Sequence, residues 1–217
     1  MKNIYLFIIT IGLLMSSCKN HEISKSGNIE ELEHQILKEL QLELKQNLDD
    51  INSNLESLII SKTANEIIIS NMENNTKYHD SLDYHFANLY PYLVFSPNET
   101  TFNYLENSGM FLIANDSIRA SASNLYGVKY EIYKSFESIY FTEHYTNYIK
   151  PMFMEEFETF EFYRSFKPKN YNQFIENKAY KGVMRYTTDA INTFIFMQSG
   201  LKEDVEKLIS EIDKELN

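Results

Sequence analysis

The sequence predicts an all-α protein, an elongated helical bundle whose long N-terminal and C-terminal helices run antiparallel. Apolar residues recur at steps of three or four over both ends of the chain, which is the spacing of one helix face. The chain holds only 6 glycines and 4 prolines, fewer than a β-sandwich or a phosphate-binding loop usually needs. Most of the 16 tyrosines and 15 phenylalanines lie between about residues 78 and 196. We therefore expect the terminal helices to form a charged stalk that carries an aromatic-rich distal part.

Residues 1–17 carry the features of a lipoprotein signal peptide. Lys2 precedes an apolar run over residues 4–14, which has the length of a signal-peptide core and is too short to span a bilayer. The sequence Leu-Met-Ser-Ser-Cys that follows resembles the cleavage site of bacterial lipoproteins, in which the cysteine is lipidated. Cys18 is the only cysteine, so no disulfide or thiolate site competes for it. We predict lipidation at Cys18 and a polar tether over residues 18–28, since several acyl chains anchor a protein stably.

Localisation follows from the same segment. Lys19 stands where an aspartate would favour the inner membrane, so we expect the protein at the outer membrane of the cell envelope. The sequence leaves open whether it faces the periplasm or the outside. The formal net charge of −11 argues against nucleic-acid binding and against a basic surface on anionic lipid.

Residues 29–217 form a single predicted helical domain that begins with a long helix reaching about Glu73. Asn28 with Glu31 three residues later makes an N-cap and a capping box. The average apolar step of about 3.6 is that of a straight helix, not of a supercoiled 3.5 repeat. The stripe consists of Ile29, Leu32, Ile36, Leu40, Leu44, Leu48, Ile51, Leu55 and Leu58.

Shorter elements follow in the middle of the chain. We expect a short helix over residues 81–90, a loop over residues 91–99 fixed by its two prolines, and a second short helix that ends at Gly109. Thr100 or Thr101 is the expected cap of that second helix.

The second half of the domain contains two long predicted helices. Asn115 or Asp116 caps the first of them, which Pro151 ends or kinks, and residues 152–166 continue as helix or irregular structure. The last helix runs from about Asn177 to Leu216. Its stripe consists of Val183, Thr187, Ala190, Ile191, Phe194, Met197, Leu201, Val205, Leu208, Ile212 and Leu216.

The stretch YLENSGMFLIANDSIRASASNLY carries a resemblance to a family of uncharacterised bacterial envelope proteins, known as a domain of unknown function. Its members share a long helix, a Ser-Gly pair and an Asn-Asp-x-Leu-Arg type segment, which here are LKELQLELKQNLDDI, Ser108-Gly109 and residues 115–119. FSPNETTF also matches the family pattern, and the resemblance covers most of residues 29–217. A lipoprotein signal replaces the family's membrane-spanning helix. The resemblance implies a helical envelope protein and no known activity.

The residues of this motif favour a structural role. Gly109, after Ser108, closes one helix, and Asn115 or Asp116 opens the next, which satisfies backbone groups at both ends. Arg119, one turn further, is placed to pair with Asp116 or with a carboxylate of the first helix. A ligand or partner site on the same turn is the alternative interpretation.

No metal, cofactor or catalytic site is predicted. His79, Asp83 and His85 do not share one helix face, and the Glu31–His34 pair lacks the second copy that a di-iron bundle requires. An acidic cluster is interpreted as a solvated face, with acid–base chemistry in a sugar-processing cleft as the alternative. It comprises Glu155, Glu156, Glu158 and Glu161.

A tyrosine-rich face is interpreted as core with hydroxyls at its rim, from which exposed members would form an interface hot spot. It comprises Tyr126, Tyr130, Tyr133, Tyr140, Tyr145 and Tyr148.

These observations favour a lipid-anchored structural or protein–protein interaction module without catalytic activity, which meets a protein partner or a second copy of itself. That hypothesis predicts an exposed apolar or tyrosine-rich patch and no deep polar cleft. A periplasmic protein that binds or senses a small ligand or peptide is the alternative, and it predicts a pocket between helices with converging polar groups. A carboxylate-based hydrolase is a weaker alternative, which predicts perturbed carboxylates or histidines in such a pocket.

Overall fold

A computed structural model describes residues 2–91 and 94–217, with side chains from residue 28 onward. Most of the described chain is helical, and two short strands form a hairpin between α6 and α7. The longer elements are α1 (Lys2–Asn74), α3 (Thr100–Ser108), α4 (Asp116–Asn124), α5 (Glu131–Glu137), α6 (Lys150–Glu156) and α8 (Lys178–Leu216). The shorter ones are α2 (Leu82–Ala87), η1 (Met110–Leu112), η2 (Leu125–Tyr130), η3 (Ser138–Thr142), η4 (Tyr145–Ile149), β1 (Phe157–Glu161), β2 (Ser165–Pro168) and α7 (Tyr171–Glu176).

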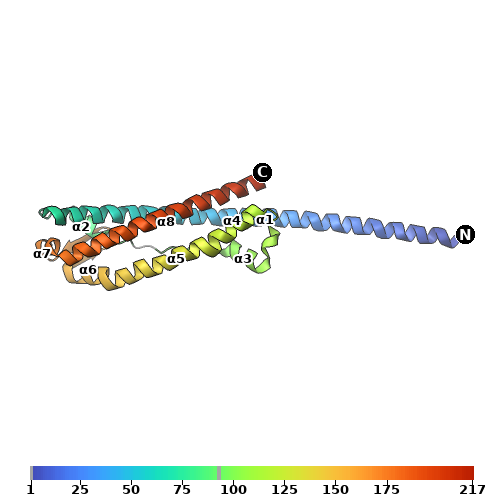
Figure 1. Ribbon diagram of the computed structural model, residues 1–217. Helices are drawn as coiled ribbons and strands as arrows, with labels where there is room; N and C mark the ends of the chain where they lie inside the picture. Colours follow the sequence, from blue (N-terminus) through green and yellow to red (C-terminus); the bar gives the residue numbers. More distant parts are fainter. Residues whose placement is uncertain (1, 92–93) are drawn as a thin grey trace.

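The molecule is an elongated bundle of three long rods, which Figure 1 shows lying side by side. Helices α1 and α8 run antiparallel: the Glu73 carboxylate near the end of α1 lies 2.7 Å from Arg185 near the start of α8. Toward the other end of α8, Gln41 donates a hydrogen bond of 2.5 Å to Asp213. The fold class predicted from the sequence is therefore confirmed.

The contact between α1 and α8 is built from aliphatic stripes. Leu40, Leu44 and Ile51 on α1 and Val205 and Leu208 on α8 are all 1% exposed or less and belong to one hydrophobic cluster. Both stripes keep the 3.6-residue period of a straight helix, so each stays on one face over the whole contact. Burying each such side chain contributes about 1.5–3 kcal/mol.

The third rod comprises residues 116–156, from α4 to α6, and contains three π-helical segments, η2, η3 and η4. Its buried positions recur every four residues, whereas an α-helix would rotate such a stripe by about 40° at each step. A π turn closes its hydrogen bonds over five residues instead of four, so it absorbs the surplus. The positions that follow this step are Ile118, Ala122, Tyr126 and Tyr130, then Phe141, the partly buried Tyr145, Ile149 and Phe153.

The described parts of the connection between α2 and α3, residues 88–91 and 94–99, lie against α1 and are held there by a polar stripe on that helix. The Asn47 amide donates to the Asn98 carbonyl at 2.9 Å and accepts from its N–H at 2.7 Å. Asn65 donates to the Leu89 carbonyl at 2.6 Å. These amides supply the hydrogen bonds that an extended segment buried between helices otherwise lacks. The buried members of the stripe are Glu43, Asn47, Asn54, Ser61 and Asn65.

The start of α3 differs from the expected threonine cap. Neither Thr100 nor Thr101 caps the helix with its side chain. The carboxylate of Glu43, which is 3% exposed, accepts from the Thr101 N–H at 2.6 Å and from the Phe102 N–H at 3.4 Å. The first amides of α3 point at α1, so the Glu43 carboxylate of α1 takes the place of an N-cap side chain.

Residues 152–166 contain a turn from helix to hairpin that the sequence analysis did not predict. Helix α6 ends at Glu156, and β1 pairs antiparallel with β2, with Phe160 opposite Phe166. Tyr163 takes a positive φ of 64° in the three-residue turn, a conformation that such hairpin loops require. The rings of Phe157 and Phe166 are buried, at 1% and 0% exposure, so the region around the hairpin has an aromatic core.

Candidate functional site

The residues of the Ser-Gly and Asn-Asp motif form a junction between the rods. Gly109 ends α3 with φ of 113°, and a Cβ there would lie 2.1 Å from the Phe111 ring. Ser108, the last residue of α3, is exposed. The Asn115 side chain caps α4 by accepting from the N–H groups of Ser117 and Ile118, at 2.9 and 3.3 Å.

The same junction joins α4 to α1 and α8. Arg119 forms an ion pair with Asp116 and donates to the Ala114 carbonyl at 2.9 Å. The Ala114 N–H donates to Glu33 of α1 at 2.6 Å, and the Asn115 amide donates to Glu215 of α8 at the same distance. The polar groups of the turn are thus engaged within the fold. The side chain of Cys18 lies outside the described residues.

The histidines and carboxylates considered as ligands or catalysts have separate structural contacts. Asp83 is buried and accepts a hydrogen bond of 2.5 Å from the Tyr78 hydroxyl. Glu155 accepts from the Tyr180 hydroxyl at 2.7 Å, and Glu156 is 5% exposed. Among the described residues, no three histidine, cysteine or acidic side chains converge with metal-binding geometry.

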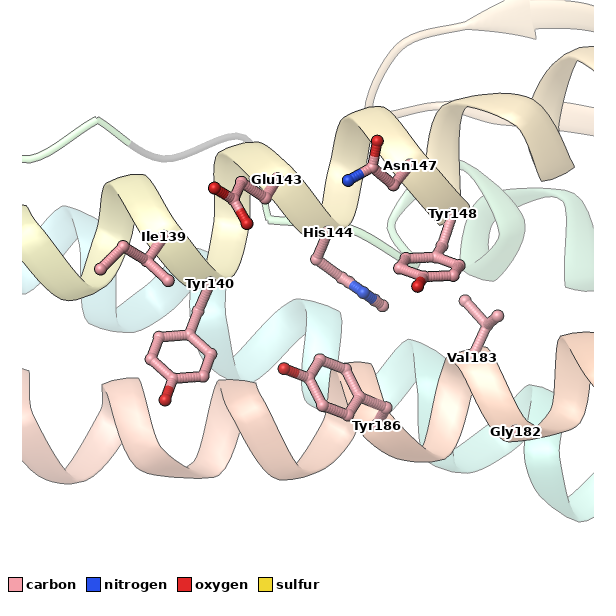
Figure 2. A pocket seen from close by; sticks show the side chains of 9 residues that line it. All are labelled: Ile139, Tyr140, Glu143, His144, Asn147, Tyr148, Gly182, Val183 and Tyr186. Carbon is pink, nitrogen blue, oxygen red and sulfur yellow. The ribbon is translucent and has the colours of Figure 1, made fainter.

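The most distinctive surface feature is a groove between the third rod and α8, shown in Figure 2. We call it the aromatic groove. Its volume is about 520 Å³. It is lined by Ile139, Tyr140, Glu143, His144, Asn147 and Tyr148 of the rod and by Gly182, Val183 and Tyr186 of α8.

The π-helical segments place the rod's side of the groove. Tyr140 lies in η3, Tyr148 lies in η4, and His144 stands between the two segments. π turns in helices occur frequently at functional sites, because they widen the helix and redirect side chains. The Tyr90 hydroxyl donates to the Phe141 carbonyl at 2.9 Å, so the connection that runs along α1 also holds η3 in place.

His144 forms the floor of the groove. It is 7% exposed, and its ring lies between those of Tyr148 and Tyr186, with centroids 5.4 and 4.8 Å away. Its Nε2 lies 2.8 Å from the Thr187 hydroxyl, which itself donates to the Val183 carbonyl at 2.9 Å. Because that hydroxyl hydrogen is already used, Thr187 accepts and Nε2 is the donor. Burial lowers the pKa of His144 below its usual value, which keeps the ring neutral at pH 7.

The walls of the groove are exposed aromatic side chains. Tyr140, Tyr148 and Tyr186 are 39%, 56% and 49% exposed. Figure 2 shows the rings of Tyr140, His144 and Tyr148 reaching from the rod toward α8, where Tyr186 meets them. A second hollow of about 230 Å³ shares Tyr140 and Tyr186 with the groove and continues past Asp189. The two hollows together therefore form a surface longer than the aromatic groove alone.

Sequence reasoning found part of this site. Tyr140 and Tyr148 belong to the predicted tyrosine face and are the exposed members of it. His144 and Tyr186 were missed, since nothing in a single sequence pairs the rod with α8 at this register. The four-residue step of the rod was the available signal, because it exceeds the period of an α-helix and indicates π turns.

The chain matches no protein-family model, and neither the curated proteins nor the solved structures contain a match to it. Within the part of the chain that the structure describes, no helix is both long and apolar enough to cross a membrane.

Proposed function

We propose that this protein is a lipid-anchored interaction module of the cell envelope, whose aromatic groove binds a segment of a protein partner. The observation that carries the proposal is the exposed set of Tyr140, Tyr148 and Tyr186 on a rigid helical frame. Tyrosine is enriched in interface hot spots, because one ring offers a large contact area at low entropic cost.

Two features of the sequence support the location. The Leu-Met-Ser-Ser-Cys segment resembles a lipoprotein cleavage site that would leave a lipidated Cys18 as the first residue, and the resemblance to envelope proteins supports the same location. The C-terminal end of α8 lies beside the early part of α1, so both lie at the end of the bundle from which α1 leads back toward the proposed anchor. The groove lies toward the other end, where a partner has access to it.

The open form of the groove favours a protein segment over a small ligand. Small-ligand sites bury most of the ligand's surface, whereas the three tyrosines of the groove leave a wide mouth. Binding of a small ligand is the second candidate, and the presence of His144 and Glu143 among the residues that line the same hollow favours it.

Affinity capture of the lipidated chain from its native membranes tests the proposal. We expect one stoichiometric partner, a second protein or another copy of the chain, that the Tyr148→Ala/Tyr186→Ala variant no longer retains. The matched control is Tyr84→Ala/Tyr104→Ala, which removes two equally exposed tyrosines outside the groove. Equal capture by both variants, or no partner at all, would contradict the proposal. Cys18→Ala should move the protein out of the membrane fraction.

A further inference from the structure

We propose that the aromatic groove receives a guanidinium group, the side chain of an arginine on the partner segment. This inference rests on the function proposed above and names the chemistry of the group that the groove recognises. Three independent features of the groove point to a planar cation: its ring faces, its hydrogen-bond acceptors and its charge.

The ring faces come from two elements. The rings of His144 and Tyr186 are 4.8 Å apart with an interplanar angle of 43°, and Tyr148 flanks the histidine on its other side. Tyr140 lines the same hollow from η3. Aromatic faces attract a cation within about 6 Å of the ring centroid, and arginine is the commonest partner.

The floor of the groove offers an acceptor. His144 donates through Nε2 to Thr187, so the neutral ring carries no hydrogen on Nδ1, and no described group donates to that atom. This free lone pair on the ring is the acceptor that the groove offers to a donor from a partner. A guanidinium carries five N–H donors and no acceptor, which complements this floor.

The charge of the groove has one sign. Glu143 lines the groove and Asp189 lines the adjoining hollow, and neither has an ion-pair partner among the described residues. No lysine or arginine lines either hollow. The nearby basic residues Lys181 and Arg185 of α8 are already paired with Glu73. Unpaired carboxylates beside desolvating rings select a cationic partner group, and the net charge of −11 steers such a group toward the protein.

The shape of the groove favours arginine over lysine. A guanidinium is flat, stacks on aromatic rings and meets a carboxylate through two parallel hydrogen bonds, whereas an ammonium is a compact and strongly hydrated charge. The groove presents ring faces at its floor and walls, and the Glu143 carboxylate lies at its rim, an arrangement that suits the flat ion.

The test compares two nearly isosteric probes, N-acetyl-arginine amide and N-acetyl-citrulline amide, of which only the first is charged. The full lipidated chain in detergent micelles, labelled with ¹³C at histidine, gives one ring signal for each of its 5 histidines. A His144→Gln variant assigns the groove signal. We expect a saturable shift of that signal at millimolar arginine probe, and binding of the citrulline probe at least about tenfold weaker.

Matched variants locate the contact. Glu143→Gln should weaken binding of the arginine probe about two- to fivefold, since one partly solvated ion pair is lost. Glu106→Gln, an exposed carboxylate on α3, should leave it unchanged. Thermal unfolding by circular dichroism confirms that both variants fold.

Equal shifts with both probes, no saturable shift, or an unchanged affinity in Glu143→Gln would overturn the inference. A shift with the neutral sugar maltotriose in place of the arginine probe would also overturn it. The proposed function fails separately. If capture of a protein partner still depends on Tyr148 and Tyr186 while the arginine probe does not bind, the partner contacts the groove through other chemistry.

Discussion

Tyrosine serves the two faces of the third rod in opposite ways. On the inner face, Tyr126, Tyr130 and Tyr133 are 3%, 0% and 0% exposed. On the outer face, Tyr140 and Tyr148 are 39% and 56% exposed. Both sets lie on one continuous helix, so neither propensity nor composition separates them.

The difference comes from what covers each face. The inner tyrosines pack against rings of other elements: Phe102 of α3 stacks on Tyr126 with centroids 4.5 Å apart, and Phe95 lies 5.1 Å from both Tyr130 and Tyr133. Burial, together with the nearby Glu43 carboxylate, raises the pKa of Tyr126 well above its usual value, so its phenol stays neutral. No described element covers the outer face of the groove. The same residue type thus contributes to stability on one side and is available for binding on the other.

The largest effect is expected from truncating an inner ring. Tyr130→Ala should lower the free energy of unfolding by about 3–5 kcal/mol, because it removes a fully buried ring and leaves a cavity. Tyr148→Ala on the outer face should cost less than about 1 kcal/mol. Urea unfolding followed by circular dichroism measures both values. Similar costs for the two variants would erase the distinction between the faces.

A second prediction concerns Glu43, which holds the start of α3 against the inner tyrosines. Glu43→Ala should cost about 2–3 kcal/mol, because the N–H groups of Thr101 and Phe102 lose a charged acceptor in a buried place. Glu56→Ala, which removes an exposed carboxylate of the same helix, should change stability by less than about 0.5 kcal/mol. The same denaturation experiment measures both, and a negligible loss in Glu43→Ala would show that α3 needs no carboxylate cap.

Replacing two glycines by alanine should change the stability of the protein in opposite directions. Gly109→Ala should destabilise the protein by about 1–2 kcal/mol, because φ at Gly109 is 113° and the new Cβ meets the Phe111 ring. Gly200→Ala in α8 should stabilise it by about 0.5–1 kcal/mol, since a Cβ there meets nothing within 4 Å and alanine favours the helix. Differential scanning calorimetry compares the two midpoints, and shifts in the same direction would contradict this account.

A smaller, pH-dependent effect on stability is expected from two partly buried carboxylates, Asp50 and Glu137. Burial raises the pKa of Asp50 and of Glu137, and the charge of Asp50 raises that of Glu137 further. Groups with a raised folded pKa contribute stability that is full below their unfolded pKa of about 4 and is lost as pH rises through the folded value. Asp50→Asn should therefore be slightly more stable than the natural protein at pH 7, by less than about 1 kcal/mol. The gain should vanish at pH 4, as urea midpoints at the two pH values would show; a gain at pH 4 alone would reverse the sign.

The sequence predicts the regular parts of this fold well, for a physical reason. In α1 and α8 the apolar step matches the helix period, so the stripe marks the face that packs against the rest of the bundle, except at its start, where Ile29 and Leu32 are exposed. The Asn115 cap is equally local, because the side chain bonds to amides two and three residues ahead. Local signals of this kind need no knowledge of the rest of the chain.

Features that depend on a partner element were not predictable in the same way. Glu43, Asn47 and Asn65 look like solvated helix residues until the segment beside them is placed, and then they are its hydrogen-bond partners. The hairpin after Glu156 alternates phenylalanine with polar residues, a pattern that a helix with an acidic face also accommodates. The groove required the register of the rod against α8, which brings His144 to Thr187.

Site-specific photo-crosslinking in the native cell tests most directly the claim that the outer aromatic face is the working surface. p-Benzoylphenylalanine replaces Tyr186 in the groove or, as a control, Tyr104 on α3, two tyrosines of similar exposure at 49% and 48%. The account predicts that the probe at Tyr186 yields one discrete crosslinked species and that the probe at Tyr104 yields none. Crosslinking at Tyr104 alone, or at neither position, would contradict it.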